Sequence, residues 1–211
     1  MRKPIVFAAA IVLMLAFVTG VQASPRVGDV IPFGEWNWRV LDVQDGKALI
    51  ITENLIEPRP YNVELAEVTW EKCTLREYLN GEFLQKFTAE EQRRIAETRV
   101  SNPDNLWCGT NGGNNTIDKV FLLSLEEVVK YFGDSGQLQN EPGDKPYIDD
   151  QYNSARIAMD VNGNPWWWWL RSPGFSSGYA ASVYDEGYVH VYGFDVIADH
   201  LGVRPALWLN L

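Results

Sequence analysis

The stretch that decides the fold is WWWWLRSPG at residues 166–174, and it is followed near the C-terminus by GVRPALWL at residues 202–209. Four consecutive tryptophans are tolerated only where both faces of an extended segment are covered. Because side chains alternate along a strand, Trp166 and Trp168 are expected to face one way, and Trp167 and Trp169 the other. One pair fills the core, and the other lies under a loop or lines a groove. Trp167 and Trp169 are therefore candidate ligand-binding residues.

Strands are predicted on both sides of this stretch. Residues 27–56 alternate like β-structure, and Asp45-Gly46 between two apolar runs predicts a hairpin. Near the C-terminus, apolar and aromatic runs punctuated by glycine predict strands at residues 166–170, 180–184, 188–194 and 203–209.

The middle of the chain has helical periodicity. Apolar residues at helical spacing predict two short helices within residues 75–87, divided at Asn80-Gly81. Two capping boxes, which begin at Thr88 and Ser124, predict two more helices. We therefore expect an α+β fold of C-type-lectin-like type: one small twisted antiparallel sheet that joins N- and C-terminal strands, flanked by short helices, with long loops on one side.

The first residues have the pattern of a secretory signal peptide. Basic residues precede an apolar run at 5–18, and VQA at residues 21–23 provides a small-residue cleavage site. We predict a signal peptide at residues 1–23, a single α+β domain at residues 24–211, and a secreted protein that is extracellular or in the cell envelope. After cleavage we expect no stable membrane insertion. An uncleaved membrane anchor is the alternative.

The composition limits the classes of partner. The chain has 28 acidic and 18 basic residues, for a net charge of −10. An acidic surface repels phosphate backbones and anionic lipids, so we expect no nucleic-acid binding and no binding to membrane surfaces. The charge is compatible with cationic partners, divalent ions and neutral polymers.

Two cysteines, Cys73 and Cys108, would enter an oxidising compartment. We predict that they form a disulfide, which would contribute ~3–4 kcal/mol in the chain-entropy model. Two free thiols or a metal pair are the alternatives. Zinc is disfavoured because His190 and His200 are the only histidines.

Motifs along the chain carry a family resemblance. They are WRVLD at residues 38–42, Trp70, LREYLN at 75–80, Phe83, TIDKVFLLS at 116–124, WWLRSPG at 168–174 and GVRPAL at 202–207. As a set they resemble a bacterial family of domains of unknown function, the DUF6273 type, which is found in secreted and cell-surface proteins. The resemblance implies no activity, since this family has no assigned chemistry.

The C-terminal third is more distantly similar to the C-type-lectin-like fold, in the version shared with formylglycine-generating enzymes. That similarity implies a Trp-rich strand, a glycine-punctuated hairpin and a closing terminal strand. EPG at residues 141–143 lacks the Asn of the calcium-dependent sugar-binding tripeptide, and the C-terminal half lacks paired redox cysteines. Neither activity is therefore carried over to this chain.

Tyr188, His190 and Tyr192 alternate with Val189 and Val191. The valines are expected inside, which leaves the two tyrosines and the histidine on an outer, wettable face. Tyrosine offers a wide contact area and a hydroxyl at low entropic cost, so these three are further candidate ligand-binding residues. The alternative is a half-buried strand whose aromatic residues reflect strand propensity.

Arg171 and Arg204 lie beside apolar strand residues and need acceptors if they are buried. Asp118 and Asp42 are plausible partners, and structural ion pairs are favoured over an anion-binding pair.

Acidic residues at 141–160 could supply oxygen ligands to calcium, although their spacing does not match an EF-hand. They are Asp144, Asp149, Asp150 and Asp160. We predict no metal and no other cofactor, with calcium as the alternative.

No catalytic motif was found. Ser172 and Ser124 are not in a G-x-S-x-G turn that could pair them with His190 or His200, and zincin, P-loop and dinucleotide patterns do not occur. The sequence favours an exported, non-catalytic binding module that recognises a glycan or a protein surface through its C-terminal Trp- and Tyr-rich strands and loops. The alternatives are a carboxylate-based hydrolase and a structural assembly domain of the cell envelope. The oligomeric state stays open.

Overall fold

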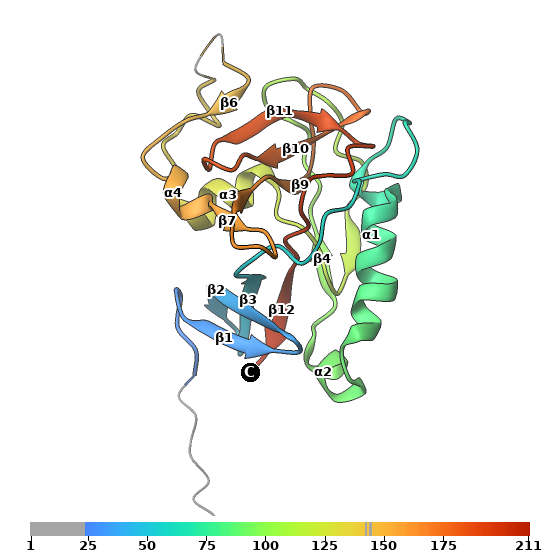
Figure 1. Cartoon of the computed structure of the whole chain (residues 1–211), viewed down its shortest axis with the longest axis vertical. Helices are drawn as coiled ribbons and strands as arrows, with labels where there is room; N and C mark the ends of the chain where they lie inside the picture. Colours follow the sequence, from blue (N-terminus) through green and yellow to red (C-terminus); the bar gives the residue numbers. More distant parts are fainter. Residues whose placement is uncertain (1–23, 142, 144) are drawn as a thin grey trace, which may run out of the picture.

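The computed structural model describes residues 24–211 except residues 142 and 144 (Figure 1). The predicted signal peptide at residues 1–23 and the candidate calcium ligand Asp144 lie outside the described residues. In the part that is described, no helix is both long and apolar enough to cross a membrane. The chain has mixed α+β structure, with antiparallel sheets and a few short helices.

The first sheet joins the two ends of the described chain. Its strands, in spatial order, are β1 (Val30–Phe33), β2 (Trp36–Gln44), β3 (Lys47–Thr52) and β12 (Ala206–Asn210). Asp45 and Gly46 have φ values of 50° and 71°, as a two-residue hairpin turn requires, so the predicted hairpin is confirmed. β12 lies antiparallel to β3, with Ala206 opposite Ile51. The N- and C-terminal strands therefore share one sheet, as predicted.

The tryptophan-rich region forms a second sheet, so the prediction of a single sheet is wrong. In spatial order the strands are β6 (Tyr147–Ile148), β11 (Val189–Asp195), β10 (Tyr179–Val183) and β9 (Trp168–Pro173). In Figure 1 this sheet lies in the upper half of the view and the first sheet in the lower half. The chain passes beside β9 on its way from β11 to β12, and Gly202 accepts a hydrogen bond from the Trp169 amide at 3.1 Å. This crossing segment links the two sheets.

Short helices and two-stranded ribbons complete the fold. The helices are α1 (Thr74–Tyr78), α2 (Ala89–Arg94), α3 (Leu125–Phe132) and α4 (Asn153–Arg156). The ribbons are β4 (Thr98–Val100) with β5 (Thr116–Asp118), and β7 (Ala158–Met159) with β8 (Pro165–Trp166). Both predicted capping boxes are present, Thr88 with Glu91 and Ser124 with Glu127. They fix the starts of α2 and α3.

The predicted division at Asn80-Gly81 is a π-type turn and not a break. Single 3₁₀ and π turns lie on either side of α1, at η1 (Trp70–Lys72), η2 (Leu79–Phe83) and η3 (Leu84–Lys86). The Asn80 carboxamide oxygen accepts hydrogen bonds from the Lys119 and Val120 amides at 2.9 and 3.2 Å. Asn80 therefore ties the helical segment to the chain that follows β5.

Trp168 and Trp169 are both buried because both faces of β9 are covered. Trp168 packs against Phe132 of α3, and the guanidinium of Arg204 lies 4.9 Å from its ring centroid. Trp169 faces the opposite side, where its ring centroid is 5.8 Å from that of Tyr61. One indole N–H donates to the Arg156 carbonyl at 3.1 Å and the other to the Arg59 carbonyl at 2.8 Å. The core therefore uses two adjacent tryptophans on opposite faces of one strand.

Arg171 and Arg204 are structural, but their partners differ from those predicted. Arg171 binds the Glu127 carboxylate and the carbonyls of Ser101 and Leu122. Arg204 donates to backbone carbonyls, among them that of Thr52 at 3.0 Å, and burial lowers its pKa to about 10. Neither residue pairs with Asp118 or Asp42 in the part of the chain described.

Asp118 is a buried acceptor in a different cluster. Its carboxylate accepts hydrogen bonds from Arg76 at 2.7 Å, the Trp70 indole at 2.9 Å and the Thr116 hydroxyl at 2.6 Å. These contacts fix η1 and α1 against β5, so Asp118 has a structural role with partners that the sequence did not indicate.

The predicted disulfide is wrong, because Cys73 and Cys108 are both free. Cys73 is buried at the start of α1, where its sulfur accepts a hydrogen bond from the Arg76 amide at 3.4 Å. Burial raises the pKa of the Cys73 thiol to about 12. Cys108 is half-buried in the 101–115 loop, and burial also raises its pKa. Cys73 therefore acts as a helix cap and not as half of a crosslink.

Candidate functional site

The outer face of the second sheet carries a continuous group of half-buried aromatic rings, here called the aromatic surface. Its members are Tyr147, Trp167, Tyr184, Tyr188, His190 and Phe194. Val189 and Val191 of β11 are fully buried, which places them on the core side as predicted.

Ring contacts make the aromatic surface continuous. Tyr147 of β6 stacks on Tyr188 with 5.5 Å between ring centroids. Tyr184 lies in the middle, with its ring centroid 5.0 Å from His190 and 5.1 Å from Trp167. Trp167 in turn stacks on Phe194 at 5.0 Å. Three of the predicted ligand-binding residues, Trp167, Tyr188 and His190, therefore lie in one surface.

His190 is neutral in this environment because burial lowers its pKa to about 4. Its Nδ1 atom is buried and has no hydrogen-bond partner among the described residues, and the same holds for the hydroxyl of Ser182. Ser182 is the residue opposite His190 on β10. The aromatic surface therefore contains polar groups with unused hydrogen-bonding capacity beneath its rings.

Trp167 and the β10–β11 turn form the rim of the aromatic surface. The Trp167 indole donates to the Asp185 carboxylate at 2.7 Å. A hydrogen bond with Asp185 raises the pKa of Glu186. Carboxylates and half-exposed rings thus lie side by side at this edge of the sheet.

Tyr192 does not belong to the aromatic surface, which corrects the prediction that Tyr188, His190 and Tyr192 act together. The pairing of β10 with β11 shifts register between Ala180 and Ser182. At this shift Gly193 has a φ of +72° and its backbone lies close to the Ala180 carbonyl, which interrupts the alternation of side chains next to Tyr192. Tyr192 instead contacts Phe175 and Trp107, with ring centroids 5.5 and 6.4 Å away.

Trp169 is not accessible to a ligand. Its side chain is 0% exposed and its indole N–H is already used by the Arg59 carbonyl. The prediction of Trp169 as a binding residue is therefore wrong, because the loop that carries Tyr61 covers that face of β9.

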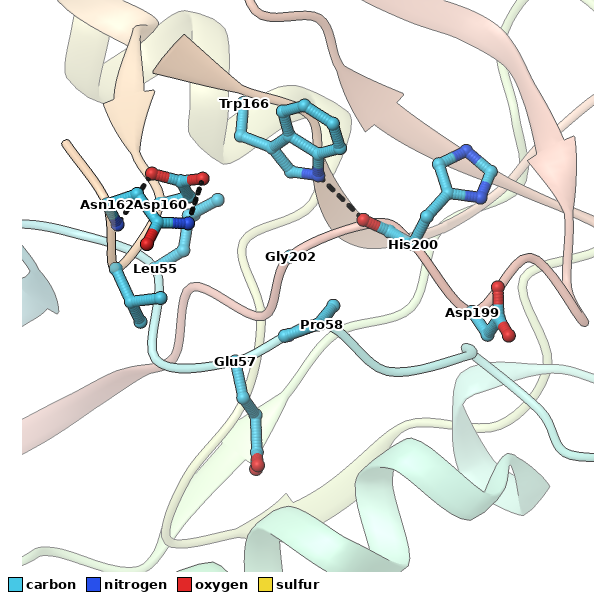
Figure 2. Close-up of a pocket in the computed structure, with 10 residues that line it drawn as sticks. Leu55, Glu57, Pro58, Asp160, Asn162, Trp166, Asp199, His200 and Gly202 are labelled. Atoms are coloured by element: carbon cyan, nitrogen blue, oxygen red, sulfur yellow. Dashed lines mark hydrogen bonds between the residues drawn. The ribbon is translucent and has the colours of Figure 1, made fainter. Parts of the chain in front are cut away.

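A pocket of about 480 Å³ adjoins the aromatic surface (Figure 2). Trp166, which is 40% exposed, lies over it, and its indole N–H donates to the His200 carbonyl at 2.7 Å. The His200 ring lines the pocket and also lies 5.8 Å from Trp167. The remaining lining residues are Leu55, Glu57, Pro58, Asp160, Val161, Asn162, Asp199 and Gly202. Through His200, the pocket and the aromatic surface form one continuous region.

Each carboxylate of the pocket has a different setting. Asp160 accepts hydrogen bonds from the backbone amides of Asn162 and Asn164 at 2.8 and 2.9 Å, and the bond from Asn164 is the main cause that lowers its pKa. Glu57 is bound by the Tyr78 hydroxyl and by Arg59. Figure 2 shows Glu57 pointing away from Trp166, while Asp160 and Asp199 lie at opposite ends of the pocket.

Sequence reasoning missed this pocket because three segments distant in the chain build it. The available signal was the run Asp160-Val161-Asn162-Gly163-Asn164, whose spacing is typical of an Asp-capped turn that projects side chains next to Trp166.

The acidic loop contributes structural contacts. Asp150 forms a buried ion pair with Arg156 at 2.9 Å and accepts from Ser135, and Asp149 accepts from Asn153 at 2.8 Å. In the residues that the structure describes, no three acidic, histidine or cysteine side chains gather into a metal-binding group. Asp150 is occupied by Arg156, so it is not free to bind calcium.

The two serines considered for catalysis have structural partners. The Ser172 hydroxyl accepts a hydrogen bond from the Leu125 amide at 3.0 Å, and the Ser124 hydroxyl accepts one from the Glu127 amide at 3.1 Å. Both fix the start of α3.

No curated protein and no solved structure gives a match. Residues 45–211 match a family described as Domain of unknown function (DUF6273), and this match covers β3, the helices, the whole second sheet and β12. The chain therefore belongs to the DUF6273 family.

Proposed function

We propose that this protein is an exported binding module that recognises a glycan through the aromatic surface and the adjoining pocket. The observation that carries the proposal is the continuity of the two through Trp166, Trp167 and His200. A ligand that crosses this region would meet ring faces and carboxylate oxygens in alternation.

The chemistry of the region suits a sugar chain. Rings of Trp and Tyr offer apolar faces to the C–H faces of a sugar, and a few placed polar groups accept its hydroxyls. Asp185 and Asn162 supply such groups at the rim and in the pocket. The aromatic rings already pack on one another, so little side-chain entropy is lost when a ligand binds.

A distant relation to C-type-lectin-like proteins is part of this proposal. It is supported by the sheet that joins both ends of the described chain and by the second sheet with its aromatic strands. Export is also part of the proposal and rests on residues 1–23. Sequencing the N-terminus of the protein recovered from expressing cells tests it, with Ser24 as the expected first residue.

A protein surface is the second candidate ligand, and a separate feature favours it. Phe175 is 60% exposed, and with Tyr192 and Trp107 it forms an apolar patch, here called the Phe175 patch. Exposed apolar patches of this kind are typical of protein contacts.

The hydrolase alternative has less support, because the described pocket does not bring two carboxylates face to face (Figure 2). A structural assembly domain of the cell envelope is the outcome that remains if no ligand is found.

Screening the protein on glycan and peptidoglycan arrays tests the proposal. Tyr188→Ala should weaken binding of any glycan hit by about tenfold, which corresponds to ~1.4 kcal/mol. Tyr192→Ala is the matched control, because Tyr192 is also a tyrosine of this region but lies in the Phe175 patch and not in the aromatic surface. If binding depends on Tyr192 and not on Tyr188, the aromatic surface is the wrong site. If no glycan binds, the glycan proposal fails.

A further inference from the structure

We propose that the pocket beneath Trp166 selects a positively charged amine on the ligand, so that the preferred glycan carries unacetylated amino sugars. This inference rests on the proposed function and deepens it. It is argued from the charge of the pocket, the orientation of the Trp166 indole and the apolar floor.

The lining of the pocket is acidic. Glu57, Asp160 and Asp199 contribute carboxylates, and none of the lining residues is a lysine or an arginine. Backbone hydrogen bonds keep Asp160 ionised at neutral pH. Asp199 forms no hydrogen bond or ion pair with the other described residues, so its charge is available to a ligand. The net charge of the whole chain, −10, also attracts cations toward the surface.

Arg59, which follows the lining residue Pro58 in the chain, is directed elsewhere. Arg59 forms an ion pair with Glu57 at 3.1 Å, and its guanidinium stacks on the Tyr78 ring at 3.6 Å. It therefore neutralises Glu57 and leaves Asp160 and Asp199 as the two carboxylates without a basic partner, one at each end of the pocket (Figure 2).

Trp166 presents its ring and not its N–H group. The indole N–H is bonded to the His200 carbonyl and is not available to a ligand, which leaves the π system of the ring as the part of Trp166 that can attract one. A cation above an indole is attracted by the ring quadrupole, and tryptophan is the best aromatic partner for this interaction. A neutral acetamide gains no such attraction.

The floor of the pocket is apolar and firmly packed. Leu55, Pro58 and Gly202 form it, and a side chain at Gly202 would lie only 2.3 Å from the Leu55 Cδ1 atom. A partly dehydrated pocket with an aromatic wall and carboxylates at its ends strengthens the binding of an ammonium group. The aromatic surface beside it also has carboxylates, at the Asp185-Glu186 turn, but Asp185 accepts from the Trp167 indole and is hydrogen-bonded to Glu186. Because these two are already engaged, we assign charge selection to the pocket.

The test compares two oligosaccharides with one backbone. The protein, expressed from the full-length chain, is titrated calorimetrically with a glucosamine oligomer and with its fully N-acetylated counterpart at about pH 6, where such an amine is protonated. We expect the amine form to bind about tenfold more tightly, and this preference to shrink in high salt. An N-trimethylated oligomer, whose charge does not depend on pH, should keep the preference at about pH 7.5.

Pocket variants locate the effect. Asp199→Asn and Trp166→Leu should each reduce the preference for the amine form by about threefold or more. Glu64→Gln, an exposed carboxylate outside the pocket, is the matched control and should leave it unchanged. Thermal unfolding of each variant shows whether the fold is intact.

The outcomes separate the two proposals. If both oligomers bind equally and binding still requires Tyr188, the amine inference is overturned and the glycan function stands. If the amine form is preferred but Asp199→Asn and Glu64→Gln lower its binding equally, the preference is a property of overall charge and the pocket assignment is wrong. If neither oligomer binds, the inference is overturned, and the glycan arrays decide the proposed function.

Discussion

Replacing Arg171 with methionine should destabilise the protein strongly. The Arg171 guanidinium is buried and makes six hydrogen bonds, which reach the Ser101 and Leu122 carbonyls, the Asn102 carboxamide and both oxygens of Glu127. It therefore joins β9 to α3, to the loop that follows β4 and to the segment just before α3. Methionine fills a similar volume but offers no donor.

The expected loss of stability follows from the groups left behind. The Leu122 carbonyl is buried and is left without this donor, which costs about 1–3 kcal/mol. Ser101 is exposed, so water replaces part of what its carbonyl loses. The Glu127 side chain is 29% exposed, so water replaces part of what it loses. Removing one partner of a buried pair costs about 3–5 kcal/mol in general, so we expect Arg171→Met to cost about 3–4 kcal/mol. That is a large part of the ~5–15 kcal/mol that stabilises a typical domain.

Urea unfolding followed by tryptophan fluorescence measures this loss. Arg171→Lys keeps the charge but not the planar guanidinium group. The free energy of unfolding of this variant should therefore lie between those of Arg171→Met and the native protein. Arg99→Met, at an exposed position of β4, is the matched control and should stay within ~0.5 kcal/mol of the native protein. A loss below ~1 kcal/mol for Arg171→Met would refute the reasoning.

Three further perturbations have defined outcomes. Reducing agent should leave the melting temperature unchanged, and a thiol reagent should modify Cys108 well before buried Cys73. His190 has a pKa of about 4 in the folded protein, below its unfolded value of ~6.5. Its stabilising contribution is therefore present above pH ~6.5 and is lost as pH falls toward 4. His190→Phe should remove about 2 kcal/mol of the fall in unfolding free energy over that range. Gly193→Ala should cost at least ~1 kcal/mol more than Gly163→Ala in urea unfolding, because both have positive φ but only at Gly193 would the new Cβ lie 2.0 Å from a carbonyl oxygen.

Local signals in the sequence predicted local structure well. The Asp45-Gly46 turn and the boxes at Thr88 and Ser124 depend on contacts within a few residues. The burial of Val189 and Val191 was predicted from the local alternation of side chains along one strand. The pairing of β12 with the N-terminal hairpin was also predicted, because both segments needed a covered apolar face.

The predictions that failed depend on distances between remote segments. Spacing along the chain cannot show that Cys73 caps α1 while Cys108 lies in another loop. The register shift near Gly193, which separates Tyr192 from His190, depends on how β10 pairs with β11. The second sheet was missed for the same reason, since strand periodicity does not reveal which strands share a sheet.

The four consecutive tryptophans show how local and remote effects combine. Each indole N–H finds its own acceptor: the His200 carbonyl for Trp166, the Asp185 carboxylate for Trp167, the Arg156 carbonyl for Trp168 and the Arg59 carbonyl for Trp169. Strand alternation predicts two pairs, but the break between β8 and β9 at Trp167 gives every ring a different environment. The first two rings face the pocket and the aromatic surface, and the last two fill the core on either side of β9. A ligand on the first two rings therefore contacts a segment whose position is fixed by the packing of the last two in the core.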